Sequence, residues 1–362
     1  MKISIDPKWW VLISIGTGTL MAALDGSVVN SILPILQIYF HSSVASIQWV
    51  STTYLLILGG FLLTFGRLGD IHGHKKMYLW GLIIFIVSSV FCGSAWSLPI
   101  LVIFRAVQAI GGAMMASNAP AIITGSFLSH QRGRAFGMVS TMTYLGLTLG
   151  PSIGGWFVQY FSWRMVFYIN IPFGVLGFIL SSIFIPNDSA DNVPQNFDIW
   201  GAFVFLLSLT SLMLWLNLGA DAGWTSLPII AIFISSVLLT IIFIIIERKI
   251  QFPMVDLNLF RNQLFTNSAI SALINYISLF SVTFLLPFYL IQGRSLSPAH
   301  SGLLLAFQPI MMAIAAPISG ILSDRHGSRI PGMVGMALLA FGLFILSQMG
   351  EDSDLLFTGL AL

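Results

Sequence analysis

Long apolar runs, separated by short polar segments, dominate this chain from end to end. Each run has about twenty residues, the length that a helix needs to cross the hydrocarbon core of a bilayer. Because the bilayer interior offers no water to the backbone, the peptide groups of such a run must be hydrogen-bonded within it, as they are in a helix. The alternating strand pattern of a membrane β-barrel is not seen. We therefore expect an all-α, polytopic transmembrane protein, with helices at residues 9–34, 47–65, 77–96, 98–124, 135–161, 165–185, 200–218, 227–246, 267–291, 302–322 and 331–349.

Composition excludes a soluble protein. The chain is 57% hydrophobic and 8% charged, whereas a soluble domain carries about a quarter charged residues. Its single cysteine, Cys92, cannot form an intrachain disulfide, and no Cys or His cluster has the spacing of a zinc site. No buried nucleophile, histidine and acid set suggests an enzyme. We expect neither cofactor nor metal, and neither enzymatic activity nor a nucleic-acid partner.

The basic residues predict an orientation. Of the 15 Lys and Arg residues, twelve fall on the side of the expected helices that also holds the amino terminus. The other side holds Arg164 and Arg294, and Arg105 falls within a span. Because positive charges concentrate in cytoplasmic loops, we expect a cytoplasmic amino terminus.

The end of the chain and one long polar connection suggest how it is organised. A twelfth apolar run begins at Leu355 and has only eight residues, 355–362, where a span needs about twenty. We therefore interpret the chain as carboxy-terminally truncated. The polar segment PNDSADNVPQNFD predicts a flexible linker. The expected domains are a first six-helix half at 1–185, a cytoplasmic linker at 186–199, two inserted helices at 200–247, and an incomplete second half at 248–362 with helices 9–11 and the start of 12.

Two loops repeat the same pattern. Residues 66–76 read GRLGDIHGHKK and residues 320–330 read GILSDRHGSRI, and both fit G-x-L-x-D-x-H-G-x-[K/R]. A generic polar turn is one interpretation. Duplication into two parallel halves is the other, and it is common among transporters. The displacement between the copies then implies two additional helices between the halves, which 200–218 and 227–246 provide.

Two charged residues lie well inside the expected spans, Asp25 and Arg105. Each costs about 2.5–3.5 kcal/mol at the bilayer centre, so such residues are functional candidates by default. Desolvation disfavours the charged form of a carboxyl group, which makes Asp25 a candidate proton carrier. The alternative is that both residues only fix helix packing. Ser27 and Asn30 lie about one turn from Asp25, and Pro34 is expected to break or end this helix.

The fifth expected helix carries GLTLGPSIGG at 146–155. The spacing of Gly146, Gly150 and Gly154 places them on one face, where another helix can approach closely. Pro151 removes one backbone hydrogen bond and can kink the helix. Ordinary tight packing is the alternative to a functional role.

Together these motifs resemble the major facilitator superfamily, specifically its fourteen-helix drug:proton antiporters. Residues 66–76 resemble the loop motif between helices 2 and 3. Segment RAVQAIGGA, 105–113, resembles the helix 4 motif, in which Arg105 and Gln108 match and Ala109 departs. Residues 146–155, including Gly155, resemble the helix 5 antiporter motif. LDGSVVNSILP at 24–34 resembles the helix 1 motif, and PMVDLNLFRN at 253–262 resembles the segment before helix 9.

The resemblance implies proton-coupled efflux of amphipathic or cationic small molecules such as drugs, by alternating access, in a bacterial plasma membrane. A metabolite carrier or importer on the same fold, and a membrane protein without transport activity, remain alternatives. The expected partners are a small-molecule substrate, protons and the lipid bilayer, and the sequence does not identify an adaptor protein for export. The implied proton-coupling and substrate residues are Asp25, Arg105, Asn30, Ser27 and Gln108. The implied conformational residues are Gly66, Arg67, Asp70, Gly73, Lys75, Gly146, Gly150, Pro151, Gly154, Gly155, Asp324 and Arg325.

Two further expectations concern acidic residues. By the two-fold symmetry of the halves, Asp324 should reach the start of the fifth helix, whose free N–H groups attract a carboxylate. The resemblance implies that Asp70 docks near a helix 13, which this chain does not contain. Because only Asp25 is an acid well inside a span, we expect a lipophilic or monovalent substrate rather than a dication.

Overall fold

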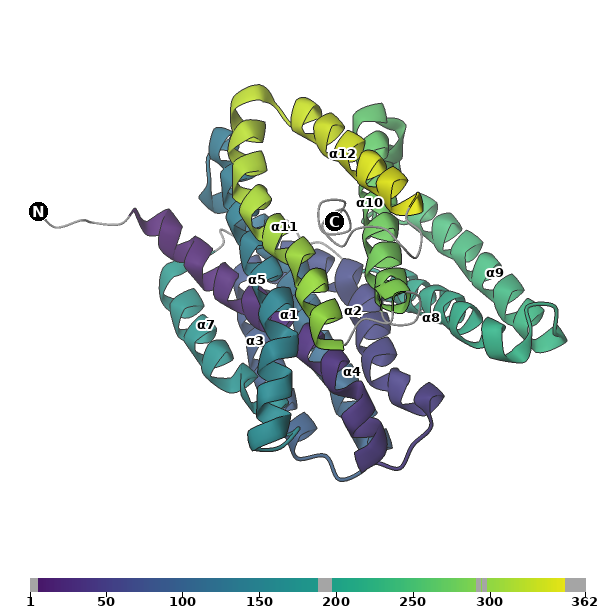
Figure 1. Ribbon diagram of the computed structural model, residues 1–362. Helices are drawn as coiled ribbons and strands as arrows, with labels where there is room; N and C mark the ends of the chain where they lie inside the picture. The colour runs from purple at the N-terminus through teal and green to yellow at the C-terminus, as the bar shows by residue number, and fades with distance from the viewer. Residues whose placement is uncertain (1–5, 188–196, 291–293, 295–297, 349–362) are drawn as a thin grey trace, which may run out of the picture. The chain divides into compact units, whose positions relative to one another are not determined.

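The computed structural model describes residues 6–187, 197–290, 294 and 298–348, and the described part is helical without strands. Ten helical segments of this part are long and apolar enough to cross a membrane, with α6 and α7 counted as one. The helices are α1 (Pro7–Tyr39), α2 (Val44–His72), α3 (His74–Gly93), α4 (Leu98–Ser126), α5 (Arg132–Tyr160), α6 (Met165–Tyr168), α7 (Asn170–Phe184), α8 (Ile199–Ala222), α9 (Leu227–Lys249), α10 (Gln263–Phe288), α11 (Pro298–His326) and α12 (Arg329–Ser347) (Figure 1).

The expected all-α membrane fold is confirmed, with one difference in detail. The sixth expected helix is one span from Met165 to Phe184, which carries the two labels α6 and α7 because of a single residue, Ile169, whose φ and ψ stay helical. Pro34 was expected to break or end the first helix, and this is wrong, because α1 continues through it to Tyr39. A proline removes only one hydrogen bond, and helices within a bilayer tolerate it. The expected twelfth helix at Leu355 and most of the linker lie outside the described residues.

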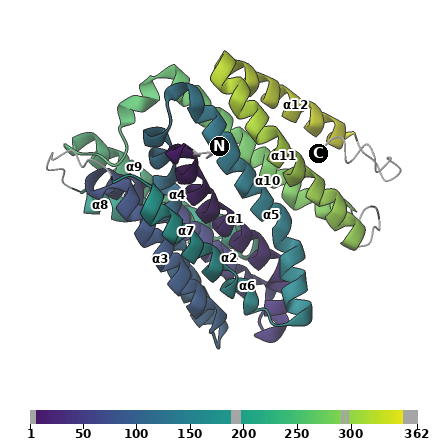
Figure 2. The same cartoon turned by 90° about the vertical axis from the view of Figure 1, so that its left-hand side faces the viewer.

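The chain divides into two compact units. The first unit holds residues 1–126 and 149–257, and the second holds 127–148 and 258–362. The division passes through α5 between Thr148 and Leu149, so each unit contains part of this helix. Figure 2 shows α5 as one continuous helix.

The first unit is built on close contact between α3 and α4. A side chain on Gly111 would collide with the backbone of Gly81 and Phe85. Glycine therefore lets the two helices approach more closely than larger residues allow. An apolar cluster that includes Leu24, Leu101 and Phe167 fills the space beside them. This packing fixes the face of α4 that carries Arg105.

Helices α8 and α9 form a hairpin within the same unit (Figure 1). The turn between them begins at Gly223, whose φ of 84° favours glycine. The hydroxyl groups of Ser208 and Thr240 share a hydrogen bond of 2.7 Å across the hairpin. Leu206 of α8 packs over Gly60 of α2, so the hairpin is attached to the first unit through α2.

The second unit joins the first half of α5 to α11. Gly137 faces the backbone of Ala316 and Pro317, where a larger residue would collide. The Thr141 hydroxyl donates a hydrogen bond to the Ala313 carbonyl over 3.1 Å. Small residues on both helices therefore hold their backbones in close contact.

Candidate functional site

A buried polar network surrounds Asp25 in the first unit. Arg105 Nη1 donates to Asp25 Oδ2 over 2.6 Å, and Gln108 Nε2 donates to Oδ1 over 3.1 Å. Asn170 Nδ2 donates to Oδ1 over 2.6 Å. Ser89 accepts from both Gln108 and Asn170. These five residues are the Asp25 network, and each is at most 1% exposed.

Four helices bring these side chains together. Asp25 is on α1, Ser89 on α3, and Asn170 begins α7. Arg105 and Gln108 lie three residues apart on α4, so both project from the same face. They also contact each other, because Arg105 Nη1 donates to Gln108 Oε1 over 2.6 Å. Asn170 is the first residue of α7, and its side chain meets Asp25.

The Arg105 guanidinium has a second set of contacts with α2. Its Nε donates to the Val50 carbonyl over 3.4 Å, and its Cζ lies 4.2 Å from the centre of the Tyr54 ring. A desolvated cation over an aromatic face is stabilised by about 2 kcal/mol. Arg105 therefore links α1, α2 and α4 through one cation.

Charge balance explains why this network can be buried. Asp25 and Arg105 form an ion pair with side chains 0% and 1% exposed. Removing one partner of such a pair costs about 3–5 kcal/mol, because the other charge stays buried alone. Asp25 accepts three hydrogen bonds, so the network fits its carboxylate form. Asn170 Oδ1 is buried and has no partner.

The structure places two of the expected residues elsewhere. Asn30 is exposed, and its Oδ1 accepts a hydrogen bond from Ser51 on α2 over 2.6 Å. Ser27 packs against Gly150 of α5. We expected both to lie near the face of Asp25. Residues two and five positions beyond Asp25 point to different neighbouring helices, because each position turns the helix by about 100°.

The helix 5 glycines divide into two groups. Gly150 lies against Ser27 and the backbone of Val28 of α1, where a side chain would collide, and a methyl group on Gly154 would have to displace the Ser31 hydroxyl. Gly155 faces open space, where no atom lies within 4 Å of the position that a methyl group would take. Gly146 is buried in the second unit. Pro151 lies within α5 without ending it. The close approach expected at this motif is therefore present between α5 and α1 at two of its glycines.

The first loop motif forms a compact turn. Gly73 separates α2 from α3 with φ of 95°, a conformation that favours glycine. Asp70 Oδ2 lies 3.7 Å from Arg67 Nη1, and its Oδ1 lies 3.5 Å from His74 Nε2. Asp70 is half exposed and has local partners. Gly66 faces Ser117 of α4.

Comparison with known proteins agrees with these features. The sequence profile of the Major Facilitator Superfamily matches residues 15–362. The chain belongs to the major facilitator superfamily. This superfamily consists of multi-pass membrane transporters of small molecules, and it is not enzymatic.

Curated bacterial relatives cover nearly the whole chain. The riboflavin transporter RibZ of Clostridioides difficile is 34% identical over 96% of this chain and 75% of its own length. The tetracenomycin C resistance and export protein of Streptomyces glaucescens is 32% identical, over 97% and 65%. The multidrug transporter MdtP of Bacillus subtilis is 31% identical, over 98% and 66%. The chain thus spans from 65% to 75% of the length of these relatives.

Solved structures show the same fold. The human organic anion transporter MFSD10 matches with a TM-score of 0.66 and 16% identity, over 99% of this chain and 82% of that one. The proton:xylose symporter XylE matches with a TM-score of 0.60 and 14% identity, over 98% and 77%.

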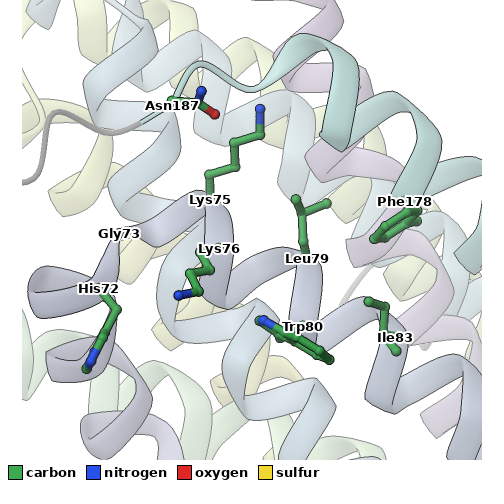
Figure 3. A pocket seen from close by; sticks show the side chains of 9 residues that line it. All are labelled: His72, Gly73, Lys75, Lys76, Leu79, Trp80, Ile83, Phe178 and Asn187. Atoms are coloured by element: carbon green, nitrogen blue, oxygen red, sulfur yellow. The ribbon is translucent and has the colours of Figure 1, made fainter.

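A surface pocket of about 400 Å³ lies beside the first loop motif of this major facilitator chain (Figure 3). Lys75 and Asn187 lie at one side of it, and Trp80, Ile83 and Phe178 lie at another (Figure 3). The Lys75 ammonium donates to the Ser182 carbonyl over 3.0 Å, which connects α3 to α7. A basic side and an aromatic side are typical of a membrane–water interface. The pocket includes no residue of the Asp25 network.

The second loop motif makes the contact that the sequence predicted. Within the second unit, Asp324 Oδ1 accepts from the Gly133 N–H and Oδ2 from the Arg134 N–H, each over 2.7 Å. The carboxylate thereby caps two backbone donors at the start of α5, which the helix itself leaves unsatisfied. Arg325 is exposed in the last turn of α11. The role of Asp324 as a latch stays a prediction.

Several buried polar residues were not found from the sequence. Asn170 and Ser89 join the Asp25 network, and Asn118 of α4 hydrogen-bonds His74 over 2.8 Å. Each is an uncharged polar residue within an apolar run, which is the one signal that the sequence offered. Asp198 and Glu247 are each 3% exposed, so Asp25 is one of three buried carboxylates in the described part of the chain.

Proposed function

We propose that the chain is a proton-coupled efflux transporter of amphipathic or cationic small molecules, working by alternating access. The observation that carries this proposal is the buried Asp25 network, in which an acid in the bundle interior is held by Arg105 and two amides. The resemblance to fourteen-helix drug:proton antiporters supports it, and so do the names of two relatives, one a tetracenomycin C export protein and one a multidrug transporter.

The network suggests how proton binding changes the first unit. A proton on Asp25 removes the negative charge that holds Arg105 Nη1 and leaves Arg105 with its contacts to Gln108 and Val50. The link between α1 and α4 is then weaker, while the link between α2 and α4 remains. Gly150 and Gly154 let α5 lie directly on α1, so a shift of α1 is transmitted to α5. Coupling by this route needs no large movement at Asp25 itself.

A metabolite carrier or importer on the same fold is the second candidate. The riboflavin transporter, at 34% identity, is the observation that favours it. The helix 5 motif favours export, because its GPxxGG run resembles the antiporter motif. The direction in which substrate moves, relative to the direction in which protons move, therefore separates the exporter from the importer.

The proposed orientation has the amino terminus and both loop motifs in the cytoplasm of a bacterium, as the uneven distribution of Lys and Arg suggests. We also propose that 1–185 and 248–362 are the two halves of the transport fold, joined by the linker at 186–199 and the inserted helices at 200–247.

Everted membrane vesicles test the function. Respiration acidifies their interior, and an antiporter uses this gradient to accumulate substrate and release protons. We expect ethidium, a monovalent lipophilic cation, to collapse part of the gradient in vesicles that contain the chain. Riboflavin tests the carrier alternative, and the bis-cation dequalinium tests the expectation of a monovalent substrate. Substrate that crosses the membrane in the same direction as the protons would contradict antiport. Equal transport rates for dequalinium and ethidium would contradict the expectation of a monovalent substrate.

Asn170 is expected to serve the protonated state of Asp25. In the structure, Asn170 Oδ1 has no hydrogen-bond partner. If the amide turned by 180°, this oxygen could accept a hydrogen bond from a protonated Asp25. Replacing Asn170 by Leu removes both the donor and this acceptor. We expect proton-driven efflux to fall about tenfold, since a hydrogen bond to a charged group contributes about 1.5–3 kcal/mol. The optimum pH should shift as well. Ser181→Ala, at a buried polar residue of the same helix, is the control, and equal effects of both changes would contradict the role.

Asp324 is expected to favour the inward-closed state. Asp324→Ala removes the cap at Gly133 and Arg134, and a carboxylate at a helix start contributes about 1 kcal/mol, which corresponds to about a fivefold change in population. Ser140 of α5 lines a hollow between α5 and α11 of the second unit. We expect faster labelling of a Ser140→Cys variant by a membrane-impermeant maleimide from the cytoplasmic side. Arg325→Ala, which removes the neighbouring exposed charge, should leave the labelling rate unchanged. Equal rates in the Asp324→Ala and parent proteins would refute the latch.

A further inference from the structure

Two buried carboxylates hold the ends of the α8–α9 hairpin. Asp198 immediately precedes α8, and its Oδ1 accepts a hydrogen bond from the Gly201 N–H over 2.9 Å. Glu247 lies in the last turn of α9, and its Oε2 accepts from the Val255 N–H over 3.1 Å. Each side chain therefore uses one oxygen to fix the backbone next to the hairpin.

The other oxygen of each carboxylate has no partner. Asp198 Oδ2 and Glu247 Oε1 are both fully buried and make no hydrogen bond. Both lie over the same glycine: a methyl group on Gly201 would collide with Asp198 Oδ2 and would be 3.2 Å from Glu247 Oε1. Two carboxylate oxygens without hydrogen-bond donors therefore lie close to Gly201, which has no side chain to fill the space beside them.

The neighbouring groups offset the pair only in part. The Met254 N–H is a second backbone donor to the Glu247 carboxylate, beside that of Val255. Arg67 of α2 is the cation that acts on Glu247 from a neighbouring helix, but its Nη1 is directed to Asp70, at 3.7 Å, and its Nε has no partner. Arg248, Lys249 and Asp256 are exposed. Within residues 6–187, 197–290, 294 and 298–348, no ion pair includes Asp198 or Glu247.

We propose that Asp198 and Glu247 form a second proton-binding site, in which one proton is shared between Asp198 Oδ2 and Glu247 Oε1. Two ionised carboxylates that approach the same buried glycine repel each other strongly, because water is excluded from the space around it, and one shared proton removes this repulsion. One proton taken from solvent leaves the pair with a single negative charge. The same proton provides the donor that both unpartnered oxygens lack.

The site connects proton binding to the geometry of the hairpin. Asp198 caps the start of α8, and Glu247 fixes Val255 in the segment that leads from α9 towards the second unit. Loss of the shared proton places two like charges side by side, so one of these backbone contacts must open to admit water. This site shares no residue with the Asp25 network and does not depend on the proposed transport function.

Infrared spectroscopy of the purified chain in lipid nanodiscs tests the shared proton directly. At neutral pH we expect a carboxylic acid C=O band that shifts on transfer to D₂O. This band should disappear in Glu247→Gln, whose amide replaces the O–H donor and so preserves the contact with Asp198. It should also disappear in Asp198→Asn, whose remaining Oδ1 can still cap α8.

Asp6→Asn is the matched control for the spectrum. Asp6 is exposed, and the Lys8 side chain hydrogen-bonded to it lowers its pKa, so it carries no proton at neutral pH and its replacement should leave the band unchanged. A spectrum in which neither Glu247→Gln nor Asp198→Asn removes a carboxylic acid band would overturn the proposal. That result would indicate two ionised groups, with Glu247 paired to Arg67.

Melting of the same samples gives a second, independent readout. The parent protein should lose thermal stability as the pH rises and the shared proton is released. Glu247→Gln should lack this part of the pH dependence, because its amide cannot ionise. Identical pH dependence in the parent protein and in Glu247→Gln would count against the site even if the variant folds normally.

Discussion

Asp25→Asn is expected to abolish proton-driven efflux. The substituted amide keeps the shape of the side chain and can still accept from Gln108 or Asn170, but it cannot bind and release a proton. The change also leaves the Arg105 cation buried without its counterion, which costs about 3–5 kcal/mol of stability. Efflux into everted vesicles, driven by an imposed pH gradient, measures the effect, and we expect it to fall to the background of vesicles without the chain.

Two controls separate lost coupling from lost folding. Substrate exchange across the membrane in the absence of a proton gradient should survive in Asp25→Asn, since it requires the two conformations but no proton. Asp6→Asn changes an exposed acid outside the spans and should transport normally. Normal gradient-driven efflux by a well-folded Asp25→Asn protein would show that another group carries the proton.

Arg105→Ala is expected to cause the second largest loss of transport. Its removal leaves Asp25 in a site at most 1% exposed with no opposing charge, and burial then favours the protonated acid. A carboxyl group that cannot release its proton cannot complete an exchange cycle. We expect gradient-driven efflux to disappear, and we expect Arg105→Lys to restore only part of it, because a lysine cannot reach Asp25, Gln108 and Val50 with a planar fork.

Arg164→Ala is the matched control for this change. Arg164 also stacks on an aromatic ring, with its Cζ 4.6 Å from the centre of the Trp163 ring, and it also donates to a backbone carbonyl, that of Ala95. It lies outside the Asp25 network. Comparable loss of efflux in both variants would indicate that Arg105 acts only in packing, whereas normal efflux and normal pH dependence in Arg105→Ala would refute its role.

The fold could be predicted from the sequence because the bilayer restricts the choices. An apolar run of about twenty residues has to be a helix in a membrane, so the eleven expected helices were found near their expected positions. The detail that escaped prediction depends on a single residue. Pro34 does not end α1. This outcome does not follow from hydrophobicity, because it depends on how the neighbouring helices pack around α1.

Part of the candidate site could be predicted from the sequence, because burying a charge in a membrane is costly. A charge within an apolar run is costly, so Asp25 and Arg105 stood out, and the repeated loop pattern led to the contact between Asp324 and the start of α5. Asn170 costs far less to bury, and the sequence does not distinguish it from a packing residue, whereas the structure shows that it donates a hydrogen bond to Asp25. The position of Asn30 one turn from Asp25 did not predict its neighbours, because Asn30 contacts Ser51 of α2 instead.

The buried acids Asp198 and Glu247 escaped prediction because they lie at helix ends. Asp198 seemed part of a solvated linker, and Glu247 is followed by two basic residues that suggest a helix end in water. Their burial follows from the packing of the hairpin, which brings the start of α8 and the end of α9 together. A sequence pattern that describes one helix at a time does not contain this information.

Substrate-dependent proton release is the most direct test of the proposed coupling through Asp25. The purified chain in weakly buffered detergent solution is mixed with ethidium, and a pH-indicator dye reports the protons released. If Asp25 binds a proton in the substrate-free state and returns to the carboxylate form when substrate binds, the parent protein releases protons and Asp25→Asn releases none, although both bind ethidium. Equal proton release by both proteins, or substrate binding by the parent protein without any release, would contradict this account.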